Sequence, residues 1–190
     1  MNYMANKNNM NNKFEYFLNA LHYNLYLAEV WTNKAINRLA DKSRAMKCRL
    51  PFIYKDVQIE NKKRTKEMND FLYSDKTGLS ICFANHWLKH FYACYTGFFS
   101  FVLLGLLFRF YGEVNHLIIY SVVAVPIILG YIPAYKAVFA KNRYLKYFKQ
   151  FAKEDTQWHK KWKVITFAFC IGSIVMILLG VGTMLIVLSV

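Results

Sequence analysis

Apolar and charged residues occupy separate parts of this 190-residue chain. Three runs are long and apolar: residues 91–108 and 164–190 contain no charged side chain, and residues 117–139 contain only Lys136. A run of about 20 apolar residues is long enough to cross the hydrocarbon core of a bilayer as a helix. Because lipid offers the backbone no hydrogen-bond partners, each run is expected to be helical. The pattern therefore predicts an all-α, multi-pass membrane protein with three transmembrane helices and a helical, basic N-terminal cytosolic segment.

The same pattern divides the chain into five segments. The expected order is a disordered Asn-rich start at 1–13, a cytosolic helical segment at 14–85, a membrane hairpin of two spans at 86–140, a basic aromatic cytosolic helix at 141–163, and the third transmembrane helix at 164–190. Charge and apolar mass alternate along this order, which explains how a chain with 56% hydrophobic residues also carries a net charge of +14.

Basic residues predict the orientation of the spans. Residues 1–90 contain 15 Lys or Arg against 8 Asp or Glu, and residues 141–163 contain 8 against 2. The short loop between the first two spans balances Arg109 against Glu113. Basic flanks stay on the cytoplasmic side of a membrane. We therefore expect a bacterial inner (cell) membrane protein with its N-terminus in the cytoplasm and its C-terminus outside.

A seam of apolar and small residues opens the cytosolic segment. Its members recur in steps of four and three, the period of a coiled coil or a helical bundle: Phe14, Leu18, Leu21, Leu25, Ala28, Thr32, Ala35 and Leu39. The helix could pack against its own chain or against copies of itself. About 75 non-membrane residues make a small core that often needs partners. We expect oligomerisation through the first four positions, Phe14, Leu18, Leu21 and Leu25.

Two basic clusters are candidates for binding an anionic ligand. One consists of Lys62, Lys63, Arg64 and Lys66. The other consists of Arg143, Lys146 and Lys149, which flank an aromatic stripe in the 141–163 loop. Such a helix either lies on anionic lipid or packs on the N-terminal helices. The expected partners are other copies of the chain, membrane lipid, and a nucleotide or oligonucleotide.

Motifs for catalysis or metal binding are sparse. The tetrapeptide at 75–78, "DKTG", resembles the aspartyl-phosphate motif of P-type pumps, but about 17 residues separate it from the first span and no other phosphoryl-transfer motif follows. His86 and His90 are four residues apart and could share a metal ion on one helix face. No carboxylate flanks them to orient the imidazoles. We expect no enzymatic activity, no cofactor and no metal.

Polar residues within the spans suggest where a pore wall would lie. Thr96 and Ser100 are four residues apart on the first span, and Pro126 interrupts the backbone hydrogen bonds of the second. The sequence offers no other continuous polar path through the spans, so we expect these three residues to line a pore.

The order of elements from Lys89 through the hairpin to Lys153 resembles small bacterial membrane effectors of the SLATT class, which act in anti-phage defence. The resemblance is one of layout, and the third span departs from that class. It implies a pore-forming effector. The expected function is a homo-oligomeric membrane channel gated through its basic cytosolic helices by an anionic ligand. The alternative is a non-enzymatic structural subunit of a larger inner-membrane complex.

Orientation can be tested with reporters that are active only outside the cytoplasm. A reporter fused after Val190 should be active, and the same reporter inserted near Asn8 should be inactive, because both strongly basic segments are retained inside. Enzymatic activity of each fusion in intact cells provides the measurement. The reverse pattern of activity would overturn the predicted orientation.

Overall fold

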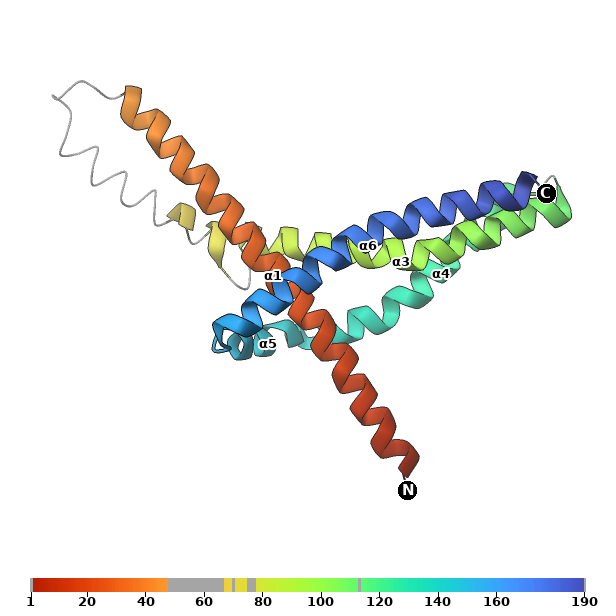
Figure 1. The fold of residues 1–190 in the computed structure, drawn as a ribbon, viewed down its shortest axis with the longest axis horizontal. Helices are drawn as coiled ribbons and strands as arrows, with labels where there is room; N and C mark the ends of the chain where they lie inside the picture. Colours follow the sequence, from red (N-terminus) through yellow and green to blue (C-terminus); the bar gives the residue numbers. More distant parts are fainter. Residues whose placement is uncertain (1, 48–66, 70, 75–77, 113, 190) are drawn as a thin grey trace.

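The computed structural model describes residues 2–47, 67–69, 71–74, 78–112 and 114–189. No strand occurs in these ranges. The principal helices are α1 (Asn2–Lys47), α3 (Leu79–Tyr111), α4 (His116–Val138), the 3₁₀ turn η1 (Ala140–Asn142), α5 (Arg143–Phe151) and α6 (Thr156–Ser189) (Figure 1). Residues 67–69 and 71–73 are also helical. The all-helical prediction is confirmed for this part of the chain.

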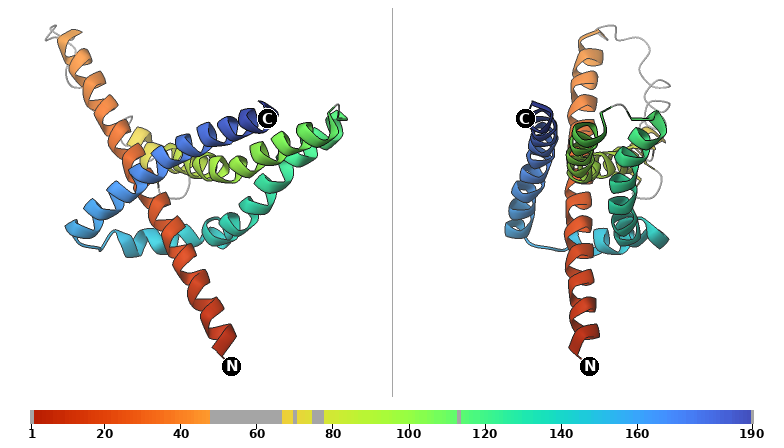
Figure 2. Two further views of the ribbon diagram at one scale, coloured as in Figure 1. Left: turned by 45° about the vertical axis from the view of Figure 1, so that its right-hand side comes forward. Right: turned by 90° about the vertical axis from the view of Figure 1, so that its right-hand side faces the viewer.

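Three helical stretches are long and apolar enough to cross a membrane, as the sequence predicted: Leu79–Tyr111, His116–Phe151 and Thr156–Ser189. The spans form a row in which α3 lies between α6 and α4 (Figure 2). Within the described ranges α4 makes no contact with α6. One chain therefore presents a single layer of spanning helices rather than a closed bundle.

Small residues allow α3 and α6 to approach closely. A Cβ atom at Gly105 of α3 would lie 3.1 Å from the Cα of Met184 on α6, and one at Gly180 of α6 would lie 3.0 Å from the ring of Phe101. In lipid, helix association depends on such van der Waals packing, because the hydrophobic effect no longer drives it. Tyr95 adds a polar tie, since its hydroxyl donates to the carbonyl of Phe169 at 2.8 Å.

A second set of contacts joins α3 to α4. The hydroxyl of Ser100 donates to the carbonyl of Val123 at 2.9 Å, three residues before Pro126. Pro126 has no N–H to donate to the carbonyl of Val122, and the Ser100 hydroxyl bonds to the next carbonyl, that of Val123. Thr96 packs against Gly130, where an added Cβ would collide with the threonine side chain. Two side chains of α3 therefore contact α4 on either side of Pro126.

The backbone turns sharply where α4 ends. Lys141 and Asn142 adopt left-handed conformations, with φ angles of 56° and 53°. Asparagine tolerates this region well, whereas a lysine there is uncommon and requires support from the surrounding structure. The turn separates α5 from the second span and directs α5 against α1 (Figure 1).

Helix α1 is continuous for 46 residues. It contains no Pro or Gly, so nothing in its sequence breaks the helix between Asn2 and Lys47. The Asn-rich start at 1–13, which the sequence pattern assigned to disorder, is therefore helical from Asn2 onward, as an extension of the packed part of α1. In the middle of α1, every residue from 18 to 25 is buried among the other helices.

The packed and exposed leucines of α1 should differ in their effect on stability. Replacing the fully buried Leu21 with Ala should lower the free energy of unfolding by about 2–5 kcal/mol, because the lost methyl groups leave a cavity. The matched change Leu39→Ala, on the exposed part of the same helix, should cost a single dissociated subunit about 0.5 kcal/mol or less, because no side chain of its own chain covers Leu39. Thermal unfolding of the purified protein in detergent measures both. Equal effects would contradict the burial of residues 18–25.

Candidate functional site

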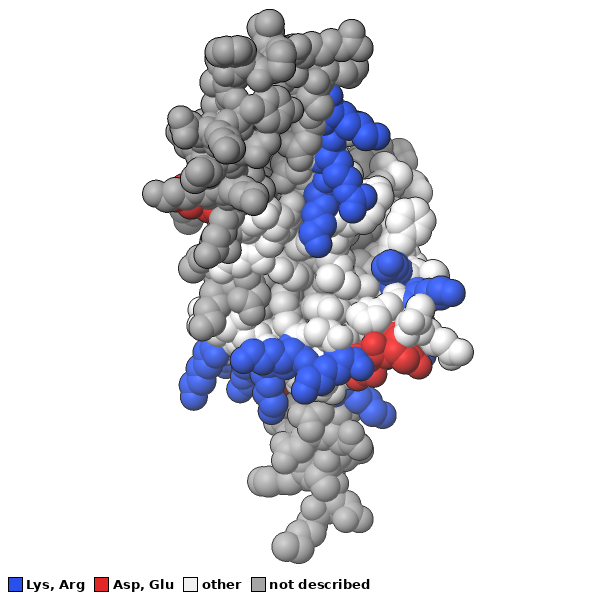
Figure 3. Space-filling view, turned by 90° about the vertical axis from the view of Figure 1, so that its left-hand side faces the viewer, with Lys and Arg blue, Asp and Glu red and all other residues white. Residues whose placement is uncertain are grey.

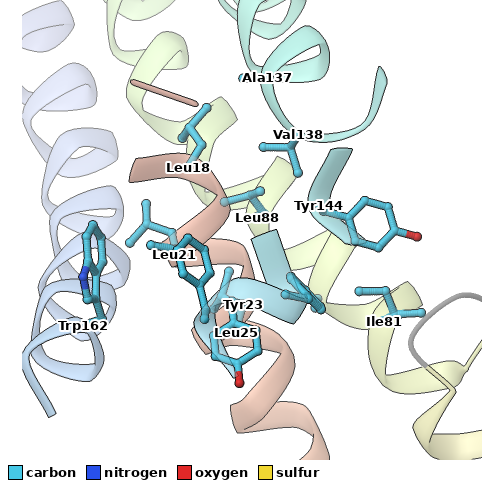
Figure 4. Packing of buried hydrophobic residues seen from close by; sticks show 14 of the residues in the cluster. Leu18, Leu21, Tyr23, Leu25, Ile81, Leu88, Ala137, Val138, Tyr144 and Trp162 are labelled. Atoms are coloured by element: carbon cyan, nitrogen blue, oxygen red, sulfur yellow. The ribbon is translucent and has the colours of Figure 1, made fainter. Parts of the chain in front are cut away.

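The most enclosed part of the chain is where α1 crosses the ends of the three spans. We define the junction as residues 18–25 of α1 with the side chains that pack on them. Eight consecutive helical residues point in every direction around the axis, since a turn takes 3.6 residues. All eight are buried, so α1 is surrounded (Figure 4). The surrounding buried side chains come from four helices: Ile81, Ala84, Leu88, Ala134, Ala137, Val138, Tyr144, Phe148, Phe151 and Trp162.

The predicted oligomer seam divides at this junction. Leu18, Leu21 and Leu25 lie inside it, in contact with their own chain, which is one of the two alternatives that the heptad pattern left open. Phe14, the first member of the seam, is 37% exposed. The later members lie beyond the junction, where α1 is no longer surrounded and contacts the rest of the chain on one side. Oligomerisation through the first four positions stays a prediction, and three of those side chains already have partners within one chain.

Polar contacts attach α1 to α4, α5 and α6. The side-chain amide of Asn19 donates to the carbonyl of Ala137 at 3.1 Å. Arg143 of α5 forms a salt bridge with Glu15 at 3.0 Å. The indole N–H of Trp158, on α6, donates to the hydroxyl of Tyr16 at 2.9 Å. These bonds come from three different helices, so a displacement of α1 would break contacts with all of them.

The chemically unusual member of the junction is His22. Its imidazole lies among three aromatic rings, with centroid distances of 5.7 Å to Phe139, 5.3 Å to Tyr144 and 5.2 Å to Phe148. Burial lowers the pKa of His22 from 6.5 to about 3; the neighbouring amide of Asn85 opposes this shift, and the charge of Lys89 adds to it. The ring is therefore neutral at physiological pH.

Several polar atoms of the junction lack hydrogen bonds. The side-chain oxygens of Asn19 and Asn24 have no hydrogen-bond partner among the described residues, and the amide of Asn85 lies beside the His22 ring. A buried polar atom without a partner costs roughly 1–3 kcal/mol. The junction is therefore well packed, with buried polar side chains among its apolar ones.

Basic side chains cover the end of the molecule next to the junction. Figure 3 views this end, and Lys and Arg form a band across it. The exposed members from α5 and the start of α6 are Lys146, Lys149, Lys153, Lys160, Lys161 and Lys163. The apolar side of α5 is buried against α1 rather than exposed to lipid. Its lysines consequently point outward, where an anionic group can reach them.

The other predicted site residues have diverse surroundings. Arg143 is paired with Glu15, so its charge is partly neutralised within the chain. Lys62, Lys63, Arg64 and Lys66 lie outside the described residues. Thr96 and Ser100 pack between α3 and α4, with Ser100 only 3% exposed, and Pro126 is half-buried on α4. A pore wall built from these three residues stays a prediction, because within one chain they serve helix packing.

The histidine pair on α3 is exposed. The rings of His86 and His90 stack with centroids 6.4 Å apart. In the ranges that the structure describes, no group of three or more His, Cys, Asp or Glu side chains lies close enough to hold a metal ion.

Comparison of the chain with protein families, curated proteins and solved structures gives no match.

Sequence reasoning missed the polar core of the junction. Asn19 and His22 are three residues apart and interrupt the apolar surface of α1 between Leu18 and Leu25. Two polar residues spaced one helical turn apart within an apolar stretch can indicate a buried polar cluster, and this signal was present in the sequence. The partners on α3, α4 and α5 could not have been identified in this way, because they are far away in the sequence.

Acidification should weaken the junction through His22. When α1 unfolds, the pKa of His22 returns toward 6.5, so the unfolded state binds more protons than the folded state between pH 3 and pH 6.5. Stability then falls as the pH drops below about 6.5, by about 1 kcal/mol over the first pH unit. The thermal unfolding midpoint, measured in detergent from about pH 7.5 to about pH 5.5, should therefore decrease.

The His22→Leu variant should show a smaller pH dependence than the wild type, because it removes the titrating group. His86→Leu is the matched control, since His86 is exposed, and it should retain the wild-type slope. If the wild type and His22→Leu lose the same stability over this range, His22 is not the group responsible.

Proposed function

We propose that this protein is the subunit of a homo-oligomeric membrane channel that is gated when an anionic ligand acts on the basic helices next to the junction. The observation that carries the proposal is the enclosure of residues 18–25 of α1 by α3, α4, α5 and α6. A helix held by every span cannot move without changing how the spans pack.

The arrangement of the spans supports an oligomer. With α3 between α4 and α6, and no contact between the outer two in the described part, one chain cannot enclose a path through a membrane. Large apolar side chains of α4 are exposed on the row, among them Ile128, Leu129 and Ile132. In a bilayer these side chains face either lipid or the helices of another copy. A pore would form between copies.

The composition of the junction supports movement. Its unpaired polar atoms reduce the stability of the state in which α1 is packed. A gating ligand has to shift the equilibrium between two states by its difference in affinity for them. When the packed state is only moderately stable, a smaller difference in affinity is sufficient. The proposal therefore treats α1 as the element that moves and the spans as the elements that respond.

The position of the lysines supports an anionic ligand. Lys146 and Lys149 lie on the exposed side of α5, while Tyr144, Phe148 and Phe151 on its other side pack in the junction. An anionic group that binds these lysines would therefore act on α5, the helix that packs against α1. A nucleotide, an oligonucleotide and an anionic lipid headgroup all offer the phosphate groups that such a surface attracts.

Leakage from vesicles tests the proposal. Purified protein in phosphatidylcholine vesicles with a trapped dye should release the dye at a rate that changes when ATP, a short oligonucleotide or phosphatidylserine is supplied. The double variant Lys146→Glu/Lys149→Glu should reduce the response at least several-fold, because it reverses two charges on α5. Added salt should weaken the response in the wild type, since ions screen exposed charges.

The control is Lys34→Glu/Lys42→Glu, which makes the same change in net charge on a part of α1 away from α5. It should behave like the wild type. Vesicles that never leak, with any of the three anionic probes and at any salt concentration, would reject the channel. A stable, non-leaking protein that co-purifies with other membrane proteins would support the alternative of a structural subunit.

A further inference from the structure

Beyond the junction, α1 contacts its own chain with its polar side. We define the distal half as residues 28–39. The amide of Asn33 donates to the hydroxyl of Ser80 at 3.1 Å, and the amide of Asn37 donates to the hydroxyl of Tyr73 at 3.2 Å. The ammonium of Lys34 lies 5.6 Å from the centre of the Tyr73 ring. All three residues lie on one side of the helix.

The apolar side of the distal half is exposed. Trp31 is 72% exposed, Ile36 is 55% exposed and Leu39 is 67% exposed. Ala28 and Thr32 are exposed as well. A solvated helix normally buries its apolar side and exposes its polar one. This segment does the opposite, which is characteristic of a surface that another helix covers.

The spacing of these residues matches a parallel coiled coil. Continuing the seam gives Thr32 and Leu39 as a positions and Ala28 and Ala35 as d positions. Trp31 is then a g position and Ile36 an e position. In a parallel coiled coil, a g residue faces the e residue five positions later on the neighbouring helix. Trp31 of one copy would therefore face Ile36 of the next, so both large apolar side chains would be covered.

We propose that the distal half of α1 is the interface through which copies of this chain associate, as parallel helices in register. This inference rests on the proposed homo-oligomer and specifies where its cytosolic contact lies. The pairing of Trp31 with Ile36 requires parallel helices, which is why the proposal takes them as parallel. The interface places residues 28–39, rather than Leu18, Leu21 and Leu25, between the subunits.

Contact with lipid or with water explains the exposed apolar side of the distal half less well than contact with a second copy of the chain. Glu29, Lys34, Arg38 and Lys42 surround the apolar side chains, and burying them in lipid would be costly. An isolated helical contact of about 12 residues is marginal in water. Here the contact is supported by the membrane, because neighbouring spans hold the distal halves at a high effective concentration. A short self-complementary surface is then sufficient.

Disulfide formation between copies tests the inference. In full-length protein with Cys48, Cys82, Cys94 and Cys170 changed to Ser, Thr32→Cys should form a cross-linked dimer on mild oxidation in membranes. The a positions of parallel helices in register face each other. Lys34→Cys, an exposed position on the opposite side, is the matched control and should remain at least several-fold less cross-linked. Gel mobility without reductant measures both.

The register has its own test. When two differently tagged copies are co-expressed, Trp31→Cys in one and Ile36→Cys in the other should cross-link. Cross-linking of Thr32→Cys with Ala35→Cys, without cross-linking of Thr32→Cys alone, would instead indicate antiparallel helices and overturn the proposal. Leu39→Cys, a second a position, provides an independent readout if Thr32→Cys does not accumulate in the membrane.

Native mass measurement in detergent separates this inference from the proposed function. If the unmodified protein is an oligomer while Thr32→Cys and Leu39→Cys cross-link no more than Lys34→Cys, the distal half is not the interface and the homo-oligomer stands. If the unmodified protein is a monomer and no variant cross-links in membranes, both proposals fail.

Discussion

The packing of residues 18–25 of α1 against the ends of the three spans is the contact on which the rest of the structure depends. Among the described residues, α4 and α6 do not contact each other. Both pack against α3 and, at one end, against α1. α5 reaches its place because the backbone bends at Lys141 and Asn142 and because Tyr144, Phe148 and Phe151 pack in the junction. Removing α1 would expose apolar residues on all four of these helices.

The same junction combines dense packing with incomplete hydrogen bonding. Its aromatic and aliphatic side chains supply the favourable burial, at roughly 25 cal/mol per Å² of apolar surface. Asn19 and Asn24 oppose it, since the buried side-chain oxygen of each lacks a partner in the described part of the chain. A structure selected only for stability would replace such groups with apolar ones.

The two parts of α1 differ in how they contact the rest of the chain. Around the junction the helix is surrounded by its own chain and has no surface left for a partner. Further along, Asn33 and Asn37 hold the helix to the chain with hydrogen bonds while Trp31 and Leu39 remain uncovered. A single uninterrupted helix thus connects a site inside the subunit to a surface suited to contacts between subunits, and a displacement at one would be felt at the other.

The spans could be predicted from the sequence because the requirements for crossing a membrane concern neighbouring residues only. The run of apolar residues must be long enough, and every backbone hydrogen bond must be made inside the same helix. The heptad seam was also visible, but its period does not distinguish a partner in the same chain from one in a copy. Thr96 and Ser100 were predicted to line a pore; only the structure shows that Ser100 bonds to the carbonyl of Val123 and that Thr96 packs against Gly130.

What tertiary structure alone decided is the identity of the partners. Asn19 bonds to a carbonyl 118 residues away, and Glu15 pairs with Arg143 across 128 residues. These contacts depend on a bend at Lys141 and Asn142 that no glycine or proline marks in the sequence. Periodicity reports which side of a helix is apolar, a property of neighbouring residues. Which surface covers that side depends on how distant segments are brought together, and that is determined by the packing of the whole chain.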